Sequence, residues 1–250
     1  HATRRQTGLL IAEGEREIPR AWQAGLKLRE VYDCPQLTRG RQPAWEVLLP
    51  DKARREASQW YELTETLLRK IAYKDKPEGA IAIFEQPKWT WNDAVPKANR
   101  AGLYLVAVGV AKPGNLGAIA RTAAGAGFDA VFVADGVVDA FNPNAIRACT
   151  GAVFGLPIMG DTSAKIREFL ASQQAAIYAA SPHALQQYTQ VDMKRTTALV
   201  IGAEDTGLDD AWLAAGTPVG IPMSGQWVDS LNASVAAGIL MFEAVRQRGL

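Results

Sequence analysis

Cysteine and histidine are scarce in this sequence of 250 residues. The two cysteines, Cys34 and Cys149, lie far apart, and the two histidines are His1 and His183. Such low counts exclude a disulfide framework and a cysteine-based zinc cluster, and they are typical of a reducing compartment. Two histidines also argue against a histidine-rich metal site. We therefore expect a cytoplasmic protein with no metal cofactor.

Long apolar runs and a large net charge are absent as well. No apolar stretch is long enough to span a membrane and no signal peptide is visible, so we expect no membrane partner. The hydrophobic content of 48% is that of an ordinary globular protein. The net charge is +1, with a slight basic excess in residues 1–95. Charge alone favours a solvated surface over an RNA-binding one.

A proline-containing stretch divides the chain. Residues 85–100 contain two prolines, several polar residues and no sustained periodicity, which is typical of a linker. We predict a first domain at 1–90, a linker at 91–101 and a second domain at 102–250. In the first domain the pattern predicts a small α/β unit, with strands at 8–12, 29–32 and 80–84 and helices at 15–24 and 64–72.

The second domain alternates more regularly between strands and helices. Its predicted strands are short and almost continuously apolar, which indicates a parallel sheet covered on both faces. In such a sheet, ligands bind at the loops that follow the carboxyl ends of the strands. We predict strands at 103–108, 130–134, 176–180, 198–201 and 218–221, and helices at 115–126, 163–173, 209–215 and 230–247.

The first unusual loop is glycine-rich. Gly114-Asn115-Leu-Gly117 opens a predicted helix that also contains Arg121. Glycines between a strand and a helix suggest a turn that holds phosphate, although the spacing matches neither G-x-G-x-x-G nor the P-loop. On local features, Asn115 either caps the helix or faces a ligand, and Arg121 is either a surface residue or part of a site.

The second and third loops follow later strands. Gly202-Ala-Glu204 and Gly207 place a carboxylate among glycines, either beside a bound cation or in a tight turn that faces solvent. The third loop runs from Ile221-Pro-Met223 to Ser230-Leu-Asn232-Ala-Ser234. Its hydroxyl and amide groups either cap the last helix or point into a pocket.

Together, the order and spacing of these loops resemble the three motifs of the SpoU (TrmH-like) family of RNA ribose 2′-O-methyltransferases, in the SPOUT superfamily. The resemblance covers nearly all of residues 103–247, and its third motif is highly specific. Residues 1–85 resemble the small ribosomal-protein-like RNA-binding domain that often precedes the catalytic domain, through the pattern from Gly8 to Ile18. The short helix that often opens that domain is not indicated here.

The resemblance implies a fold, a cofactor and an assembly. It implies an α/β SPOUT domain whose parallel sheet carries a deep trefoil knot, which general topology rules do not favour. The knot would form the pocket for S-adenosylmethionine, and the knotted domains would pack together in a homodimer. By motif, the cofactor-binding positions are Ala180, Gly202, Gly207, Ile221, Met223, Leu231 and Ser234.

The resemblance also implies catalytic roles. Arg121 would activate the ribose hydroxyl, with Asn115, Glu204, Ser230 and Asn232 around it. An arginine side chain is effectively always protonated. Arg121 therefore either acts as a base after an unusual fall in its pKa, or stays cationic and stabilises the developing alkoxide while it holds the RNA phosphate. The second role agrees better with the chemistry of guanidinium.

The expected substrate is RNA, and the added first domain favours 23S ribosomal RNA over transfer RNA. A transfer RNA 2′-O-methyltransferase and a non-catalytic RNA-binding protein are the alternatives. A nicotinamide-dependent oxidoreductase would also account for the parallel sheet and the glycine-rich loop, with Asp135 as its acidic residue. That alternative leaves the pattern from Ser230 to Ser234 unexplained.

Overall fold

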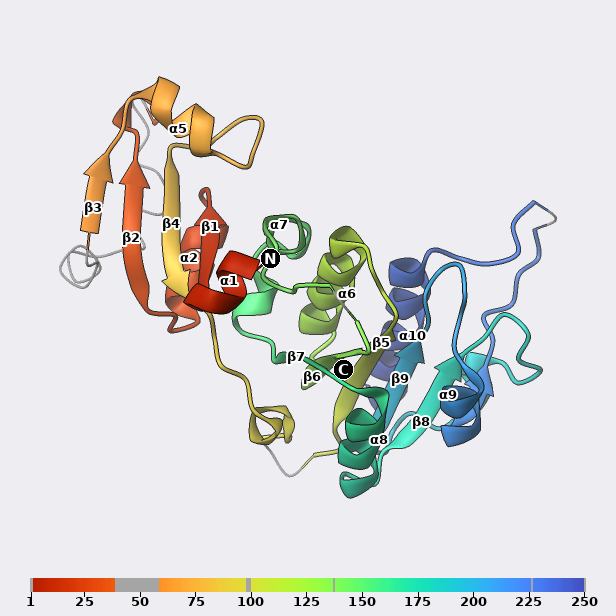
Figure 1. Cartoon of the computed structure of the whole chain (residues 1–250). Helices are drawn as coiled ribbons and strands as arrows, with labels where there is room; N and C mark the ends of the chain where they lie inside the picture. Colours follow the sequence, from red (N-terminus) through yellow and green to blue (C-terminus); the bar gives the residue numbers. More distant parts are fainter. Residues whose placement is uncertain (1, 39–58, 98–99, 137, 226, 250) are drawn as a thin grey trace. The chain divides into compact units, whose positions relative to one another are not determined.

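The computed structural model describes residues 2–38, 59–97, 100–136, 138–225 and 227–249 (Figure 1). By its internal contacts the chain divides into two compact units. The first unit comprises His1–Lys88 together with Asp139–Gly155, and the second comprises Trp89–Val138 together with Leu156–Leu250. The predicted domains were continuous, whereas the first unit takes in a segment from within 102–250.

A four-stranded mixed sheet forms the first unit. The strand order is β1-β4-β2-β3, in which β4 runs antiparallel to β1 and to β2, and β3 runs parallel to β2. The helix α1 precedes β1, where the sequence indicated none. The elements are α1 (Ala2–Thr7), β1 (Leu9–Glu13), α2 (Glu17–Gln23), β2 (Leu28–Asp33), the 3-10 turn η1 (Pro35–Leu37), β3 (Gln59–Glu62), α5 (Glu65–Ile71) and β4 (Ala80–Glu85).

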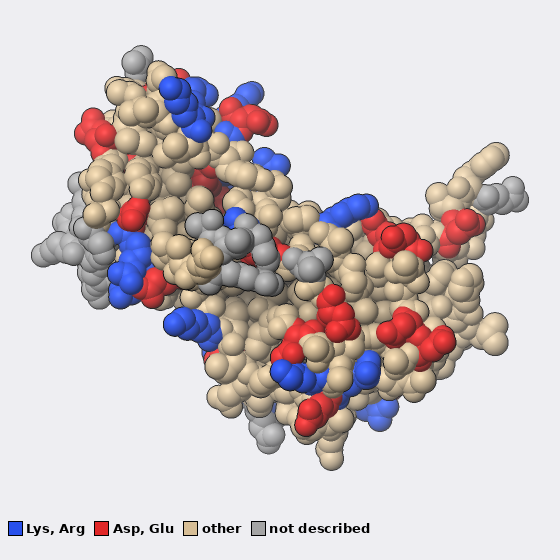
Figure 2. All heavy atoms as spheres, viewed as in Figure 1, with Lys and Arg blue, Asp and Glu red and all other residues tan. Residues whose placement is uncertain are grey.

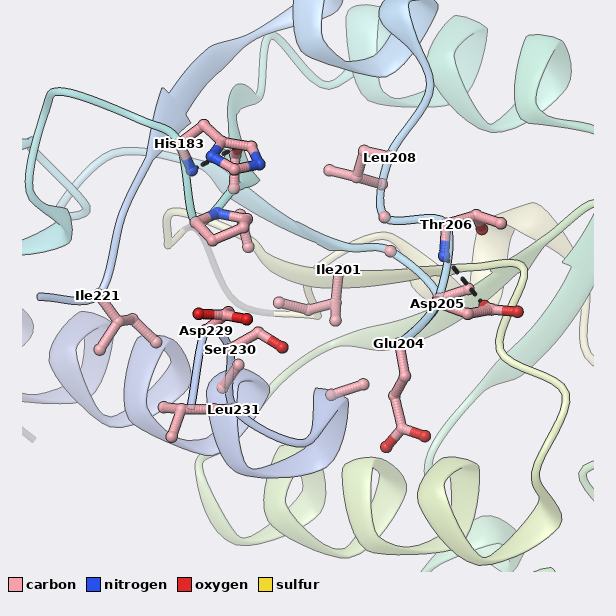
Figure 3. Close-up of a pocket in the computed structure, with 18 of the residues that line it drawn as sticks. His183, Ile201, Glu204, Asp205, Thr206, Leu208, Ile221, Asp229, Ser230 and Leu231 are labelled. Atoms are coloured by element: carbon pink, nitrogen blue, oxygen red, sulfur yellow. Dashed lines mark hydrogen bonds between the residues drawn. The ribbon is translucent and has the colours of Figure 1, made fainter. Parts of the chain in front are cut away.

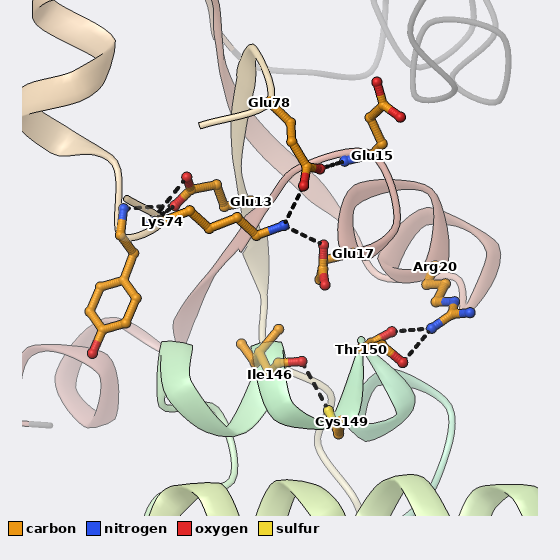
Figure 4. A network of polar contacts seen from close by, with 10 residues as sticks. Glu13, Glu15, Glu17, Arg20, Lys74, Glu78, Ile146, Cys149 and Thr150 are labelled. Carbon is orange, nitrogen blue, oxygen red and sulfur yellow. Dashed lines mark hydrogen bonds and ion pairs between the residues drawn. The ribbon is translucent and has the colours of Figure 1, made fainter. Parts of the chain in front are cut away.

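Two short helices far along the chain complete this unit. They are α7 (Pro143–Cys149), which packs against β1, and the 3-10 turn η3 (Ala152–Phe154), which packs against α2. The guanidinium of Arg20 donates to the hydroxyl of Thr150 at 2.7 Å and also to its carbonyl (Figure 4). Thr150 holds a left-handed φ of 51°, which ends α7. These contacts join segments that no local sequence pattern connects.

A polar cluster fixes the turn after β1 (Figure 4). The buried carboxylate of Glu13 accepts hydrogen bonds from the backbone N–H groups of Tyr73, at 2.7 Å, and of Lys74. The ammonium of Lys74 contacts Glu17 at 3.2 Å and Glu78 at 3.3 Å. Because the buried carboxylates of Glu13 and Glu17 both have partners, the cluster is a structural brace between β1, α2 and the loop after α5.

The second unit is built on a six-stranded parallel sheet, which confirms the predicted fold class. Its strand order is β10-β8-β9-β5-β6-β7. β7 was not predicted, since its sequence Ile-Met-Gly-Asp has only two apolar residues. The strands are β5 (Leu103–Val108), β6 (Ala130–Ala134), β7 (Ile158–Asp161), β8 (Ala176–Ala180), β9 (Thr197–Ile201) and β10 (Thr217–Val219).

Helices cover both faces of this sheet. On one face, α8 and α9 bury an aromatic cluster that includes Tyr104, Phe132 and Phe169. On the other, α6 packs along α10, and α10 contacts β9. Among the described residues no helix is both long and apolar enough to cross a membrane. The helices are α6 (Pro113–Gly125), α8 (Ser163–Ser172), α9 (Asp210–Ala215) and α10 (Ala233–Arg248), with 3-10 turns η2 (Trp91–Ala94) and η4 (Tyr188–Gln190).

Parallel pairing brings the carboxyl ends of β5, β8, β9 and β10 to one edge of the sheet. The three unusual loops follow β5, β9 and β10, so they converge at this edge. In the second unit, two helix starts differ from the sequence prediction by more than one residue. α6 begins at Pro113, where a proline needs no backbone hydrogen bond, and α10 begins at Ala233, directly after its cap Asn232.

Candidate active site

A pocket of about 330 Å³ opens at this edge of the second unit (Figure 3). Four segments line it, and they come from the ends of β8, β9 and β10 and from the start of α10. In Figure 3, Ile201, Ile221 and Leu231 lie around the cavity. The lining residues fall in the segments 180–183, 201–208, 219–223 and 229–236, together with Leu213.

The wall formed by the second loop depends on two glycines. A Cβ added to Gly202 would lie 2.3 Å from the backbone carbon of Gly207, closer than real Cβ atoms ever approach. Gly207 itself holds a φ of +68°, and its N–H donates to the carbonyl of Ala203 at 3.0 Å. The loop is therefore a closed turn that only glycine permits at both positions.

The side chain of Glu204 leaves this turn toward α6 (Figure 3), and three other side chains contact its carboxylate. One carboxylate oxygen, Oε2, lies 2.5 Å from Nζ of Lys112. The other, Oε1, accepts from Nδ2 of Asn115 at 3.0 Å and from Nδ2 of Asn232. We call Lys112, Asn115, Glu204 and Asn232 the Glu204 cluster. It joins all three loops that the sequence singled out.

Electrostatics keeps Glu204 ionised. The hydrogen bond from Lys112 and then that from Asn115 hold the pKa of Glu204 below its ordinary value of 4.5. The same contact raises the pKa of Lys112. The cluster therefore carries one ion pair at neutral pH, with both amide groups of the asparagines donating to the carboxylate.

Asn232 has two functions at once. Its Oδ1 accepts from the backbone N–H of Ser234 at 2.9 Å and from the Ser234 hydroxyl at 2.6 Å, and so caps α10. Its Nδ2 donates to Glu204 and lies 3.3 Å from Oδ1 of Asn115. Capping and participation in a site were alternatives in the sequence, and for Asn232 both hold. Asn115 is not the cap of α6, because Lys112 occupies that position.

Arg121 makes no hydrogen bond or ion pair with the described residues of the Glu204 cluster. Its side chain is exposed on α6, and within the described part of the chain it makes no hydrogen bond or ion pair. An exposed guanidinium without a partner is available to an incoming anion. Ser230, in contrast, lines the pocket itself.

The structure places the other predicted residues as follows. Ser234 is absent from the pocket lining and instead bonds to Asn232. Asp135, the acid that an oxidoreductase would need, accepts from the backbone N–H of Ser163 at 3.1 Å and from its hydroxyl. Six of the seven predicted cofactor positions line the pocket: Ala180, Gly202, Gly207, Ile221, Met223 and Leu231.

Several polar residues at or near the pocket were not found from the sequence. Asp205 and Asp229 directly follow and precede predicted site residues, and both line the pocket. His183 lines it from the segment after β8, and Lys112 reaches the Glu204 cluster from the residue before α6. Among the described residues no group of His, Cys, Asp and Glu is arranged to hold a metal ion.

Known sequence families match most of the chain. The SpoU rRNA Methylase family matches residues 102–242, and the MRM3-like substrate binding domain matches residues 2–82. Among curated proteins, the chain is 30% identical over 203 residues to the 23S rRNA (guanosine(2553)-2′-O)-methyltransferase RlmP of Bacillus subtilis, with 79% of each sequence covered.

Solved structures share the fold over the whole chain. An RNA 2′-O ribose methyltransferase is 36% identical with a TM-score of 0.82, covering 100% of this chain and 93% of that one. The SpoU methyltransferase AviRb of Streptomyces viridochromogenes, in complex with AdoMet, is 27% identical with a TM-score of 0.86, covering 99% and 93%. The convergent loops, the glycine-walled pocket and these matches show that the chain belongs to the SpoU rRNA methylase family, whose methyl donor is S-adenosylmethionine.

Proposed function

We propose that this enzyme transfers a methyl group from S-adenosylmethionine to a ribose 2′-hydroxyl of 23S ribosomal RNA. The observation that carries the proposal is the Glu204 cluster, which joins the three motif loops beside a pocket of about 330 Å³. The relative RlmP is named for this reaction, and the substrate-binding domain matched at residues 2–82 supports an RNA substrate. Because that substrate is ribosomal, we place the reaction in the cytoplasm.

The pocket residues fit the methyl donor. S-adenosylmethionine supplies an electrophilic methyl group on a positively charged sulfur. Ile221 and Leu231 offer apolar surface for a flat purine. Asp205 and Asp229 offer carboxylates that offset positive charge, and Gly202 lets the backbone approach closely.

Methyl transfer needs a ribose hydroxyl that is held in place. Its oxygen would form a bond to the methyl carbon as the bond from that carbon to sulfur breaks and leaves a neutral thioether, and the hydroxyl proton would pass to solvent. A guanidinium rarely gives up its proton, so we assign Arg121 a cationic role, in which it binds the RNA phosphate and stabilises negative charge on the attacking oxygen. Its exposure and lack of protein partners support this role. Ser230 and Asn232 would position the ribose, and Glu204 would hold the amide of Asn232 in its orientation.

We also propose a homodimer that forms through the second unit, the unit in which the family resemblance predicts a knot. Val235 and Phe242 are exposed on α10, at 50% and 52%, and Ile239 lies between them on the same stripe. A stripe of this kind at a helical spacing is typical of a helix that packs against a partner. Sedimentation equilibrium at micromolar protein should give twice the chain mass, and a single-chain mass would contradict the dimer.

Surface charge gives little help in choosing the substrate. Figure 2 shows acidic and basic side chains interspersed on the viewed face of the second unit, with no single-sign patch over the sheet. The test is therefore chemical. Purified enzyme with S-adenosylmethionine labelled in the methyl group should label ribosomal RNA, and mapping of 2′-O-methylated positions should locate one new ribose in 23S RNA. Labelling of transfer RNA alone would refute the assignment.

A further inference from the structure

Lys112 contacts the Glu204 cluster, and the proposed function gives it no role. It is the last residue before α6, with Pro113 fixing the backbone immediately after it. Its side chain is 73% exposed, yet Nζ lies 2.5 Å from Oε2 of Glu204. Both asparagine amides bond to Oε1, whereas the lysine is the side chain that holds Oε2.

The charges around Glu204 make this contact consequential. Asp205 follows it in the same loop, and Asp229 lines the pocket from the segment before α10. On α6, Arg121 is a further cation, and it makes no ion pair with the cluster in the described structure. After β8, His183 lines the opposite side of the pocket. Lys112 is thus the cation that directly contacts a carboxylate of this acidic site, at which an RNA phosphate must arrive.

We propose that Lys112 is a positioning residue for methyl transfer. It holds the Glu204 carboxylate in place for the two asparagines, and its positive charge reduces the repulsion between that carboxylate and an RNA phosphate. This inference rests on the proposed function. It acts through Glu204, since Lys112 does not line the cofactor pocket. The ammonium group of a lysine holds a carboxylate by charge as well as by hydrogen bonding.

Loss of the lysine should leave two traces in the kinetics. Without it, the Glu204 carboxylate loses its one cationic partner among the described residues and holds the asparagine amides less firmly, so kcat for RNA methylation should fall by about threefold to fivefold in Lys112→Met, the scale of an exposed ion pair. The lysine is also the main cause of the lowered pKa of Glu204, so its removal raises that pKa. The acidic limb of the kcat profile should therefore move to higher pH.

The experiment compares wild type with three variants of the full chain. Lys112→Met removes the charge, Lys112→Arg keeps it, and Lys165→Met is the matched control. Lys165, on α8, is 63% exposed and pairs with Asp161, the last residue of β7, at 3.3 Å. Neither residue lines the pocket. Each protein is assayed on ribosomal RNA from about pH 3.5 to 8, a range that includes the ordinary glutamate pKa of 4.5, with the affinity for S-adenosylmethionine measured by calorimetry.

In Lys112→Met we expect kcat to fall and the acidic limb to move to higher pH. Lys112→Arg should recover the wild-type profile, and Lys165→Met should keep it. The affinity for S-adenosylmethionine should be the same in all four proteins. A kcat loss that is uniform across pH would mean that Lys112 is merely structural and would overturn the proposal, as would wild-type kinetics in Lys112→Met. If wild-type enzyme itself fails to methylate RNA ribose, the proposed function falls, a result separate from any difference between variants.

Discussion

Replacement of Gly202 by alanine probes the closed turn that walls the pocket. The new Cβ would lie 2.3 Å from the backbone carbon of Gly207, whereas real Cβ atoms essentially never come within 3.0 Å. The neighbour is backbone, so the turn itself must open. Overpacking of this kind costs about 1–3 kcal/mol. Because the displaced backbone lines the pocket and carries Glu204, we expect the dissociation constant of S-adenosylmethionine to rise about tenfold, which corresponds to about 1.4 kcal/mol.

Isothermal titration calorimetry measures this change directly. Gly125→Ala is the matched control, since it makes the same substitution at the end of α6, where a Cβ meets nothing within 4 Å. Alanine favours a helix over glycine by about 0.5–1 kcal/mol, so the control protein should be at least as stable as wild type and bind the donor normally. Unchanged donor affinity in Gly202→Ala, with a folded protein, would refute the argument that this turn shapes the pocket.

Three further changes test the polar residues of the site. Arg121→Ala should abolish RNA methylation while calorimetry shows donor binding intact, and normal turnover would exclude its assigned role. Asn232→Ala removes the cap of α10 together with a donor to Glu204, so urea unfolding should show a loss of about 1 kcal/mol and methylation should fall with it. Because the pKa of Glu204 is lowered in the folded protein, its ionised carboxylate stabilises the fold fully above the ordinary pKa of 4.5, and this stabilisation is lost as pH falls through the lower folded-state pKa. Glu204→Gln should therefore flatten the acidic part of a curve of unfolding free energy against pH. An unchanged acidic part would contradict the direction of the pKa shift.

Much of the second unit could be predicted because its strands are apolar and short. The predicted strands at 103–108 and 130–134 coincide with β5 and β6, since Val, Leu and Phe runs between helices leave little ambiguity. β7 was missed because Ile-Met-Gly-Asp looks like a loop until it pairs with β6. Strand pairing depends on a neighbouring strand from another part of the chain, so it cannot be predicted from these four residues alone.

The site divides in the same way between local and spatial information. Asn115, Glu204 and Asn232 could be found because three motifs occur in a fixed order. Lys112 could not be found, because a lysine before a proline is an ordinary helix start until Glu204, far along the chain, reaches it. Arg121, which its motif groups with these residues, is exposed and has no hydrogen-bond or ion-pair partner among the described residues, so its role stays a prediction.

The first unit is built from two separate segments of the chain, and this determines the order in which the two units can fold during synthesis. Ile146, Cys149 and Phe154 are buried, and they come from the segment 139–155, which follows β5, α6 and β6 in the chain. During synthesis, much of the second unit therefore leaves the ribosome before the first can close its core. A gene fragment that stops at residue 88 encodes an incomplete unit, and a working RNA-binding module would have to be assembled from two separate stretches of the gene.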